Sequence, residues 1–115
     1  MKPVAFKYYR PQDLDEVLEL LDSHGDEATV LAGGQSLVPM LNMRLARPSI
    51  VVDIGGLSDQ LFIEQKNGMV CIGCCVTQRD LQDWAGLADA LPLVERVIPF
   101  VGHVQTRNRG TVVGS

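Results

Sequence analysis

Two glycine-containing runs carry the residue types that bind anionic groups. The first, Ala32-Gly33-Gly34-Gln35-Ser36, follows the apolar pair Val30-Leu31. Glycine lacks a Cβ atom and permits positive φ, so the backbone amides of such a run can approach a phosphate closely. The second run, Thr111-Val112-Val113-Gly114-Ser115, adds hydroxyl groups to the same chemistry. We therefore expect the two runs to hold one pyrophosphate between them.

The first run and the two arginines near the second run also have purely structural interpretations. Gly33-Gly34 can form a tight turn from a strand into a helix, with Ser36 as the N-cap. The run matches neither the G-x-G-x-x-G fingerprint nor the phosphate loop, whose lysine is missing here. Arg107 and Arg109 either lie in a solvated loop or form a structural pair that satisfies loop carbonyls, or else one of them lies near the anionic ligand.

No residue is assigned a catalytic role. His103 has no Ser, Cys or carboxylate at a spacing that would make it the base of a nucleophile, and we expect it to be a cation at a helix C-terminus. The acidic residues Asp13, Asp15 and Glu16 are expected to be charges in the first turn of a helix.

Three cysteines lie close together in the run Cys71-Ile72-Gly73-Cys74-Cys75. The run contains a C-x-x-C spacing, which admits a metal or redox role, but no second cysteine pair completes a zinc site. The alternative is a buried strand in which cysteine serves as a small apolar residue. We favour the buried strand and predict no metal ligand.

Length, composition and charge restrict the classes of protein. The chain has 115 residues, of which 46% are hydrophobic and 21% charged, and this balance is typical of one globular domain. The net charge of −4 and the scattered basic residues argue against nucleic acid as a partner. No apolar run approaches the length of a membrane span, and no signal-peptide core is present. We expect a cytoplasmic protein.

The elements that must position the first run alternate between strands and helices. Strands are expected at residues 6–9, 28–31 and 49–54, and helices at residues 14–24 and 37–45. Asp13 and Glu16 form a capping-box pattern at the start of the first helix, and Gly25 ends it. The third strand is almost continuously apolar, which is typical of a strand buried on both faces of a parallel sheet. The pattern predicts a β-α-β-α-β unit.

The second half of the chain has a different character. Two strands, residues 61–64 and 69–72, flank an Asn67-Gly68 pair, which predicts an antiparallel hairpin. Helices are expected from Thr77 to Trp84 and from Leu91 to Val101. A polar loop at residues 105–110 and a strand at residues 111–113 complete the expectation. These elements must position the second glycine-containing run.

The chain resembles the flavin-binding medium subunit of the molybdenum hydroxylases, the family of xanthine dehydrogenase and aerobic carbon monoxide dehydrogenase. Three motifs in order carry the resemblance: Ala32 to Leu37, Pro48 to Ile54 and Arg107 to Gly114. The opening Tyr8-Tyr9-Arg10-Pro11 is also similar to the start of the family. The resemblance implies an α/β (α+β) fold, namely the PCMH or vanillyl-alcohol-oxidase type of FAD-binding domain. Its first βαβαβ subdomain would span residues 1–55 and part of a second subdomain residues 56–115.

The resemblance further implies a cofactor, FAD, and the residues that bind it. The family's A-G-G-[HQ]-S and T-I-G-G loops bind the FAD pyrophosphate and correspond here to two sets of residues: Ala32, Gly33, Gly34, Gln35 and Ser36, and Thr111, Val112, Val113, Gly114 and Ser115. Val113 stands where the family has the first glycine of its pair, and a Cβ atom there either crowds the phosphate or requires a strained backbone.

The implied activity belongs to an oxidoreductase with several subunits. The partners would be a large subunit that contains molybdopterin and a small subunit that contains two-iron two-sulfur clusters, with electrons passing from the clusters to FAD and then to an external acceptor. Family members are considerably longer than this chain, which predicts an N-terminal fragment with weak or absent flavin binding and no activity in isolation. The alternative is a module that keeps the fold and a subunit-docking surface without binding flavin.

Overall fold

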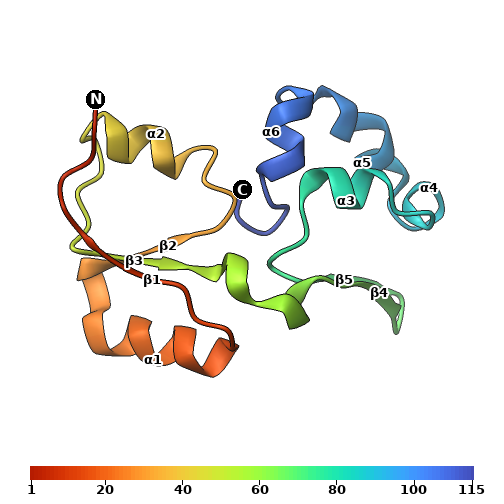
Figure 1. The fold of residues 1–115 in the computed structure, drawn as a ribbon. Helices are drawn as coiled ribbons and strands as arrows, with labels where there is room; N and C mark the ends of the chain where they lie inside the picture. Colours follow the sequence, from red (N-terminus) through yellow and green to blue (C-terminus); the bar gives the residue numbers. More distant parts are fainter. The chain divides into compact units, whose positions relative to one another are not determined.

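The chain divides into two units in the computed structural model, which describes all 115 residues. The N-terminal unit is Met1–Ser58 and the C-terminal unit is Asp59–Ser115. Figure 1 shows the elements of each unit along the chain. None of the helices is long and apolar enough to cross a membrane. The expected division into FAD-binding subdomains at residues 1–55 and 56–115 stays a prediction.

A parallel sheet of three strands forms the centre of the N-terminal unit. The strands are β1 (Lys7–Tyr9), β2 (Ala28–Leu31) and β3 (Ile50–Asp53), and their order is β1-β3-β2. Ile50, Val51 and Val52 of the central strand are buried, and the last two are 0% exposed. The predicted parallel β-α-β-α-β unit is confirmed, because the continuous apolar run of β3 is covered on both faces.

Two helices connect these strands. Helix α1 (Leu14–His24) begins at Asp13, whose side chain accepts a hydrogen bond of 2.8 Å from the N–H of Glu16, and ends at Gly25, which has a positive φ of 54°. The 3₁₀ turn η1 (Gly25–Glu27) leads into β2. Helix α2 (Leu37–Asn42) is shorter than predicted, since Arg44 adopts a left-handed φ of 59° that no α-helix can contain. The turn η2 (Ile54–Gly56) follows β3.

The C-terminal unit begins with the predicted hairpin. Strands β4 (Ile63–Lys66) and β5 (Met69–Ile72) are antiparallel, and Lys66 pairs with Met69. Asn67 and Gly68 both have positive φ, 54° and 75°, as a type I′ turn requires. The short turn η3 (Ser58–Gln60) precedes the hairpin. The two-residue loop therefore sets the register of the hairpin.

Short helices make up the rest of the C-terminal unit. They are α3 (Gln78–Gln82), α4 (Leu87–Ala90), α5 (Pro92–Val97), the turn η4 (Ile98–Phe100) and α6 (Val104–Arg109). Leu81, Leu87 and Ile98 form their buried core, against which Trp84 and Val112 pack. This core joins α3, α4 and η4 to the residues of the second glycine-containing run.

Several predictions for this unit are wrong. Helices α4 and α6 were not predicted, and α6 occupies the residues expected to form a polar loop. The helix predicted from Leu91 to Val101 ends at Val97, where Pro99 leaves only a 3₁₀ turn. The strand predicted at residues 111–113 is a single bridge between Thr77 and Thr111. His103 lies at the N-terminus of α6, not at a helix C-terminus.

The cysteine run is only partly a strand. Cys71 lies in β5, which ends at Ile72, whereas Cys74 and Cys75 lie in the turn that follows. At Gly73 a Cβ atom would lie 2.1 Å from the carbonyl oxygen of Gln60, so only glycine fits where the chain leaves the hairpin. The three thiols are half-buried and form no disulfide. The buried strand predicted through Cys75 is therefore wrong beyond Ile72.

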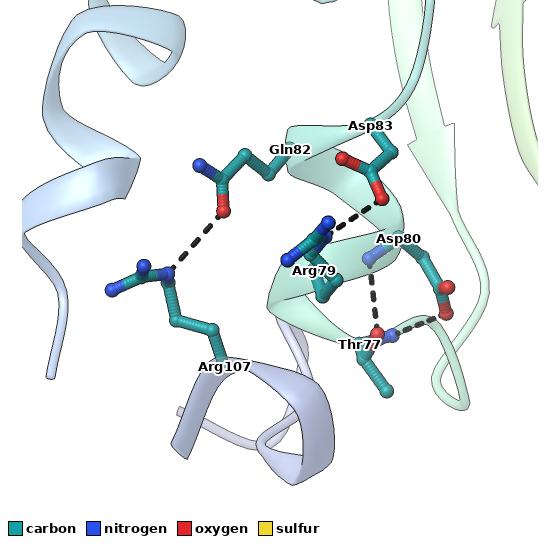
Figure 2. Close-up of polar contacts among 6 residues, drawn as sticks. All are labelled: Thr77, Arg79, Asp80, Gln82, Asp83 and Arg107. Atoms are coloured by element: carbon teal, nitrogen blue, oxygen red, sulfur yellow. Dashed lines mark hydrogen bonds and ion pairs between the residues drawn. The ribbon is translucent and has the colours of Figure 1, made fainter. Parts of the chain in front are cut away.

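Replacing Thr77 with alanine is expected to destabilise the protein by about 1 kcal/mol. Thr77 Oγ1 accepts from the N–H of Asp80 (3.0 Å), and the Asp80 carboxylate accepts from the N–H of Thr77 (3.0 Å), which completes a capping box at α3. Figure 2 shows both bonds. Urea unfolding followed by circular dichroism measures the loss. Thr77→Ser keeps the hydroxyl and should retain most of the stability; an equal loss in both variants would contradict the capping role.

Candidate functional site

The first glycine-containing run connects the carboxyl end of β2 to α2. Gly34 has a φ of +77°, a conformation that side chains with a Cβ atom rarely adopt. A Cβ atom there would lie 3.2 Å from Val38 Cγ2 and 3.5 Å from Leu31 Cδ1. The run needs a glycine at this position both for the backbone conformation and for the close approach to α2.

The amides of this run are free to bind a ligand. None of the backbone N–H groups from Gly33 to Leu37 donates a hydrogen bond within the chain. Ser36 occupies the N-cap position of α2, but its hydroxyl caps no amide, so the interpretation of Ser36 as a capping residue is wrong. Unsatisfied donors in an exposed loop are the groups that bind a phosphate oxygen. The run therefore offers a row of donors that suits phosphate oxygens.

A polar cluster lies at the same carboxyl edge of the sheet, around Asp53 at the end of β3. Tyr8 donates its hydroxyl to Asp53 Oδ2, the N–H of Gly55 donates to Asp53 Oδ1 (2.8 Å), and Arg10 Nε lies 3.5 Å from Oδ2. The hydrogen bond to Asp53 is the main cause that raises the pKa of Tyr8, with burial and the negative charge of Asp53 adding to it. Asp53 is the register partner of Leu31, which directly precedes the first run.

The second run is fixed to α3 at its start. Thr111 is buried, pairs with Thr77, and accepts a hydrogen bond at Oγ1 from the N–H of Gly114 (3.1 Å). The N–H of Val112 donates to the carbonyl of Val76 (3.0 Å). Val113 is 54% exposed and has no positive φ, so the strained backbone expected at this position is absent. The turn therefore forms with valine in place of the glycine of the family.

The end of this run meets the side chain of Gln78. Gln78 Nε2 donates to Ser115 Oγ (3.2 Å), while Gln78 Oε1 is buried without a hydrogen-bond partner. Gln78, Val112 and Ser115 also line an apolar groove of about 410 Å³ together with Leu81, Leu93, Val94, Val97, Ile98 and Val101. The groove suits an apolar group, whereas the hydroxyls and amides of residues 111–115 suit a polar one.

Arg107 holds a loop of the C-terminal unit together. Its guanidinium is buried and donates to the carbonyls of Val101 (3.0 Å) and Gly102 (3.4 Å) and to Gln82 Oε1 (3.3 Å). Figure 2 shows the side chain reaching from α6 to Gln82 of α3. The interpretation that an arginine satisfies loop carbonyls is confirmed for Arg107. Arg109 is exposed on the same helix.

No group of three His, Cys, Asp or Glu side chains is arranged to hold a metal ion. The residues predicted to bind the cofactor lie in two runs, and each run lies within its own unit. The cluster of Tyr8, Arg10 and Asp53 was missed by the sequence reasoning as a site feature. Its only signal was that Asp53 lies near the end of one predicted strand and Arg10 follows another, so that both lie at the edge that carries the first run.

A family model described as "FAD binding domain in molybdopterin dehydrogenase" matches residues 4–115. The chain belongs to this family. FAD is therefore the cofactor of the domain family, and the fold class expected from the sequence is confirmed. The open amides of residues 33–37 are consistent with a domain that binds a dinucleotide.

Similar proteins are subunits of oxidoreductases. Caffeine dehydrogenase subunit beta of Pseudomonas sp. strain CBB1 is 37% identical over 115 residues, which cover all of this chain and 39% of that protein. Quinoline 2-oxidoreductase from Pseudomonas putida 86 superposes with a TM-score of 0.92 at 38% identity, covering 100% of this chain and 40% of that one. Carbon monoxide dehydrogenase from Hydrogenophaga pseudoflava gives a TM-score of 0.93 at 34% identity, with 99% and 40% covered. The chain spans about two fifths of the length of its curated relatives.

Proposed function

We propose that the two glycine-containing runs bind the diphosphate of FAD in the medium subunit of a molybdenum hydroxylase. Two observations carry the proposal. The backbone N–H groups from Gly33 to Leu37 donate no hydrogen bond within the chain, and Gly34 among them has a left-handed backbone conformation. Phosphate oxygens accept hydrogen bonds from such amides without help from a cationic side chain. Family membership identifies the ligand as FAD rather than another phosphate compound.

The residues of this chain bind and orient the cofactor rather than react. We assign Ala32, Gly33, Gly34, Gln35 and Ser36 as one set of binding residues, and Thr111, Val112, Val113, Gly114 and Ser115 as the other. Bound FAD would supply the electron-transfer chemistry, taking electrons from iron–sulfur clusters and passing them to an external acceptor. Thr111 Oγ1 accepts from the N–H of Gly114, which leaves the hydrogen of its hydroxyl to donate to a phosphate oxygen.

The partners in this proposal are a large subunit with molybdopterin and a small subunit with two-iron two-sulfur clusters. Support comes from similar proteins that are named as medium chains or as subunits of dehydrogenases. We infer from family membership that the substrate is oxidised at the molybdopterin of the large subunit. The residues described here then supply no acid–base catalyst.

The natural polypeptide that carries these residues tests the proposal. It is purified with the subunits that co-elute, and its flavin is released by denaturation, quantified by absorbance and identified by chromatography. We expect FAD in a ratio close to one per medium subunit. An assembled complex without flavin, which also fails to take up added FAD, would contradict the assignment.

Subunit docking without flavin is the second candidate function. The apolar groove lined by Leu93, Val97 and Val101 favours it, because an exposed apolar groove is typical of a surface that binds another protein segment. The same purification separates the two functions. Assembly with the partner subunits in the absence of any flavin would support docking alone.

A further inference from the structure

A negative charge lies beside the run of residues to which we assign the FAD diphosphate. Asp53 closes β3, and its register partner Leu31 closes the neighbouring strand, two residues before Gly33. Paired strands lie about 4.8 Å apart, so Asp53 lies on the strand next to the one that leads into the run, and charges interact over roughly 10 Å at moderate salt. A bare carboxylate at this position would repel a diphosphate.

We propose that Arg10 is the countercharge that prevents Asp53 from repelling the FAD diphosphate. The inference rests on the proposed function and assigns a positioning role to residues outside the two glycine-containing runs. Arg10 directly follows β1, on the other side of β3 from the first run. It therefore balances the charge of Asp53 without occupying the ligand's place.

The contacts of Asp53 support this role. Its side chain is only 14% exposed, so water screens the carboxylate weakly, and it accepts hydrogen bonds from the Tyr8 hydroxyl and the N–H of Gly55. These donors disperse the charge but do not cancel it, because both are neutral. The Arg10 guanidinium, 3.5 Å from Oδ2, is the cation that pairs with this carboxylate. Removing Arg10 leaves a net negative charge at the edge of the sheet.

The pair Arg79–Asp83 provides a matched control. It is also an arginine–aspartate ion pair, with Nε and Oδ2 2.8 Å apart, and it joins Arg79 of α3 to Asp83 at the C-cap of that helix (Figure 2). Arg79→Gln changes the net charge of the protein by the same amount as Arg10→Gln. A general effect of charge on FAD binding would therefore appear in both variants.

The test measures the dissociation constant of FAD for the natural polypeptide and for Arg10→Gln, Arg10→Gln/Asp53→Asn and Arg79→Gln, each at low and high salt. We expect Arg10→Gln to raise the Kd about fivefold at low salt, by charge repulsion within a Debye length. High salt should bring its Kd back toward that of the unchanged protein. Asp53→Asn should restore binding in the Arg10→Gln background, because the repelling charge is gone.

Circular dichroism and thermal unfolding confirm that each variant is folded. Equal Kd values for Arg10→Gln and Arg79→Gln would overturn the inference, as would a loss that neither salt nor Asp53→Asn reverses, since that pattern is structural. Failure of the unchanged complex to bind FAD would overturn the proposed function itself. The two failures are thus distinguishable.

Discussion

A Gly34→Ala variant of the natural polypeptide is expected to bind FAD at least about tenfold more weakly than the unchanged protein. Gly34 has a φ of +77°, and a left-handed residue other than glycine costs about 1–3 kcal/mol. The added Cβ atom also lies 3.2 Å from Val38 Cγ2. The loop relieves both strains by changing its backbone angles, which turns the amides of residues 33–37 away from the diphosphate. A cost of 1.4 kcal/mol corresponds to about a factor of ten in Kd.

Gly25→Ala is the matched control for this prediction. Gly25 also has a positive φ, 54°, but a Cβ atom there meets nothing within 4 Å, and the residue caps α1 away from the glycine-containing run. The free energy of unfolding of Gly25→Ala should fall by about as much as that of Gly34→Ala. Its affinity for FAD should stay that of the unchanged protein. Fluorescence titration gives the affinity and urea unfolding gives the stability. If Gly34→Ala folds and binds FAD as tightly as Gly25→Ala, these amides are not the ligands of the diphosphate.

Replacing Arg107 with methionine is expected to destabilise the protein by about 2–4 kcal/mol, since hydrogen bonds to charged groups are worth about 1.5–3 kcal/mol each. Arg107 is 8% exposed, and its guanidinium donates to the carbonyls of Val101 and Gly102 and to the amide oxygen of Gln82. Methionine fills much of the volume but donates no hydrogen bond. Thermal unfolding should show a midpoint lower by roughly 10 °C or more for a domain of this size.

Arg109→Met separates this effect from a general loss of charge. Arg109 lies two residues further along α6 and is exposed, so its replacement should change the stability by less than about 0.5 kcal/mol. The difference in unfolding free energy between Arg107→Met and Arg109→Met measures the contribution of the hydrogen bonds that Arg107 makes. Similar unfolding midpoints would show that the loop at Val101 and Gly102 does not depend on the guanidinium.

The elements that the sequence predicted well are those specified by local chemistry. The apolar run of β3 and the glycine after α1 mark the alternation of strands and helices, and Asn67-Gly68 can form a hairpin turn with little strain. The capping box of α3 likewise depends on Thr77 and Asp80, which lie three positions apart. In each case the information lies within a few neighbouring residues.

The elements that were missed depend on contacts between distant residues. Helix α6 has polar side chains on most of its surface, and Arg107, which looks like a loop residue in the sequence, anchors it by bonds to α3 and to the loop at Val101. The strand expected after Thr111 does not continue, because the N–H of Gly114 turns back to Thr111 Oγ1. Neither the hydrogen bonds of Arg107 nor the bond from Gly114 to Thr111 can be predicted from the periodicity of the sequence.

The candidate site also contains features that neighbouring residues specify and features that depend on contacts between distant residues. The glycine-containing run at residues 32–36 could be identified from its residue types, yet the absence of a cap by Ser36 required the coordinates. The hydrogen bond between Tyr8 and Asp53 joins residues 45 positions apart, and only the strand order β1-β3-β2 brings them together. The assignment of the ten cofactor-binding residues stays a prediction, with Gly34→Ala as its most direct test.

The position of β3 in the sheet has a consequence for the order in which the chain acquires structure. β3 is the last of the three strands to be synthesised, but it is the central one, and both β1 and β2 pair only with it. During translation neither outer strand has a partner until Asp53 has left the ribosome. The apolar segments of the first half of the chain therefore stay uncovered until β3 is available, and the pairing of β3 with β1 and β2 then completes the sheet.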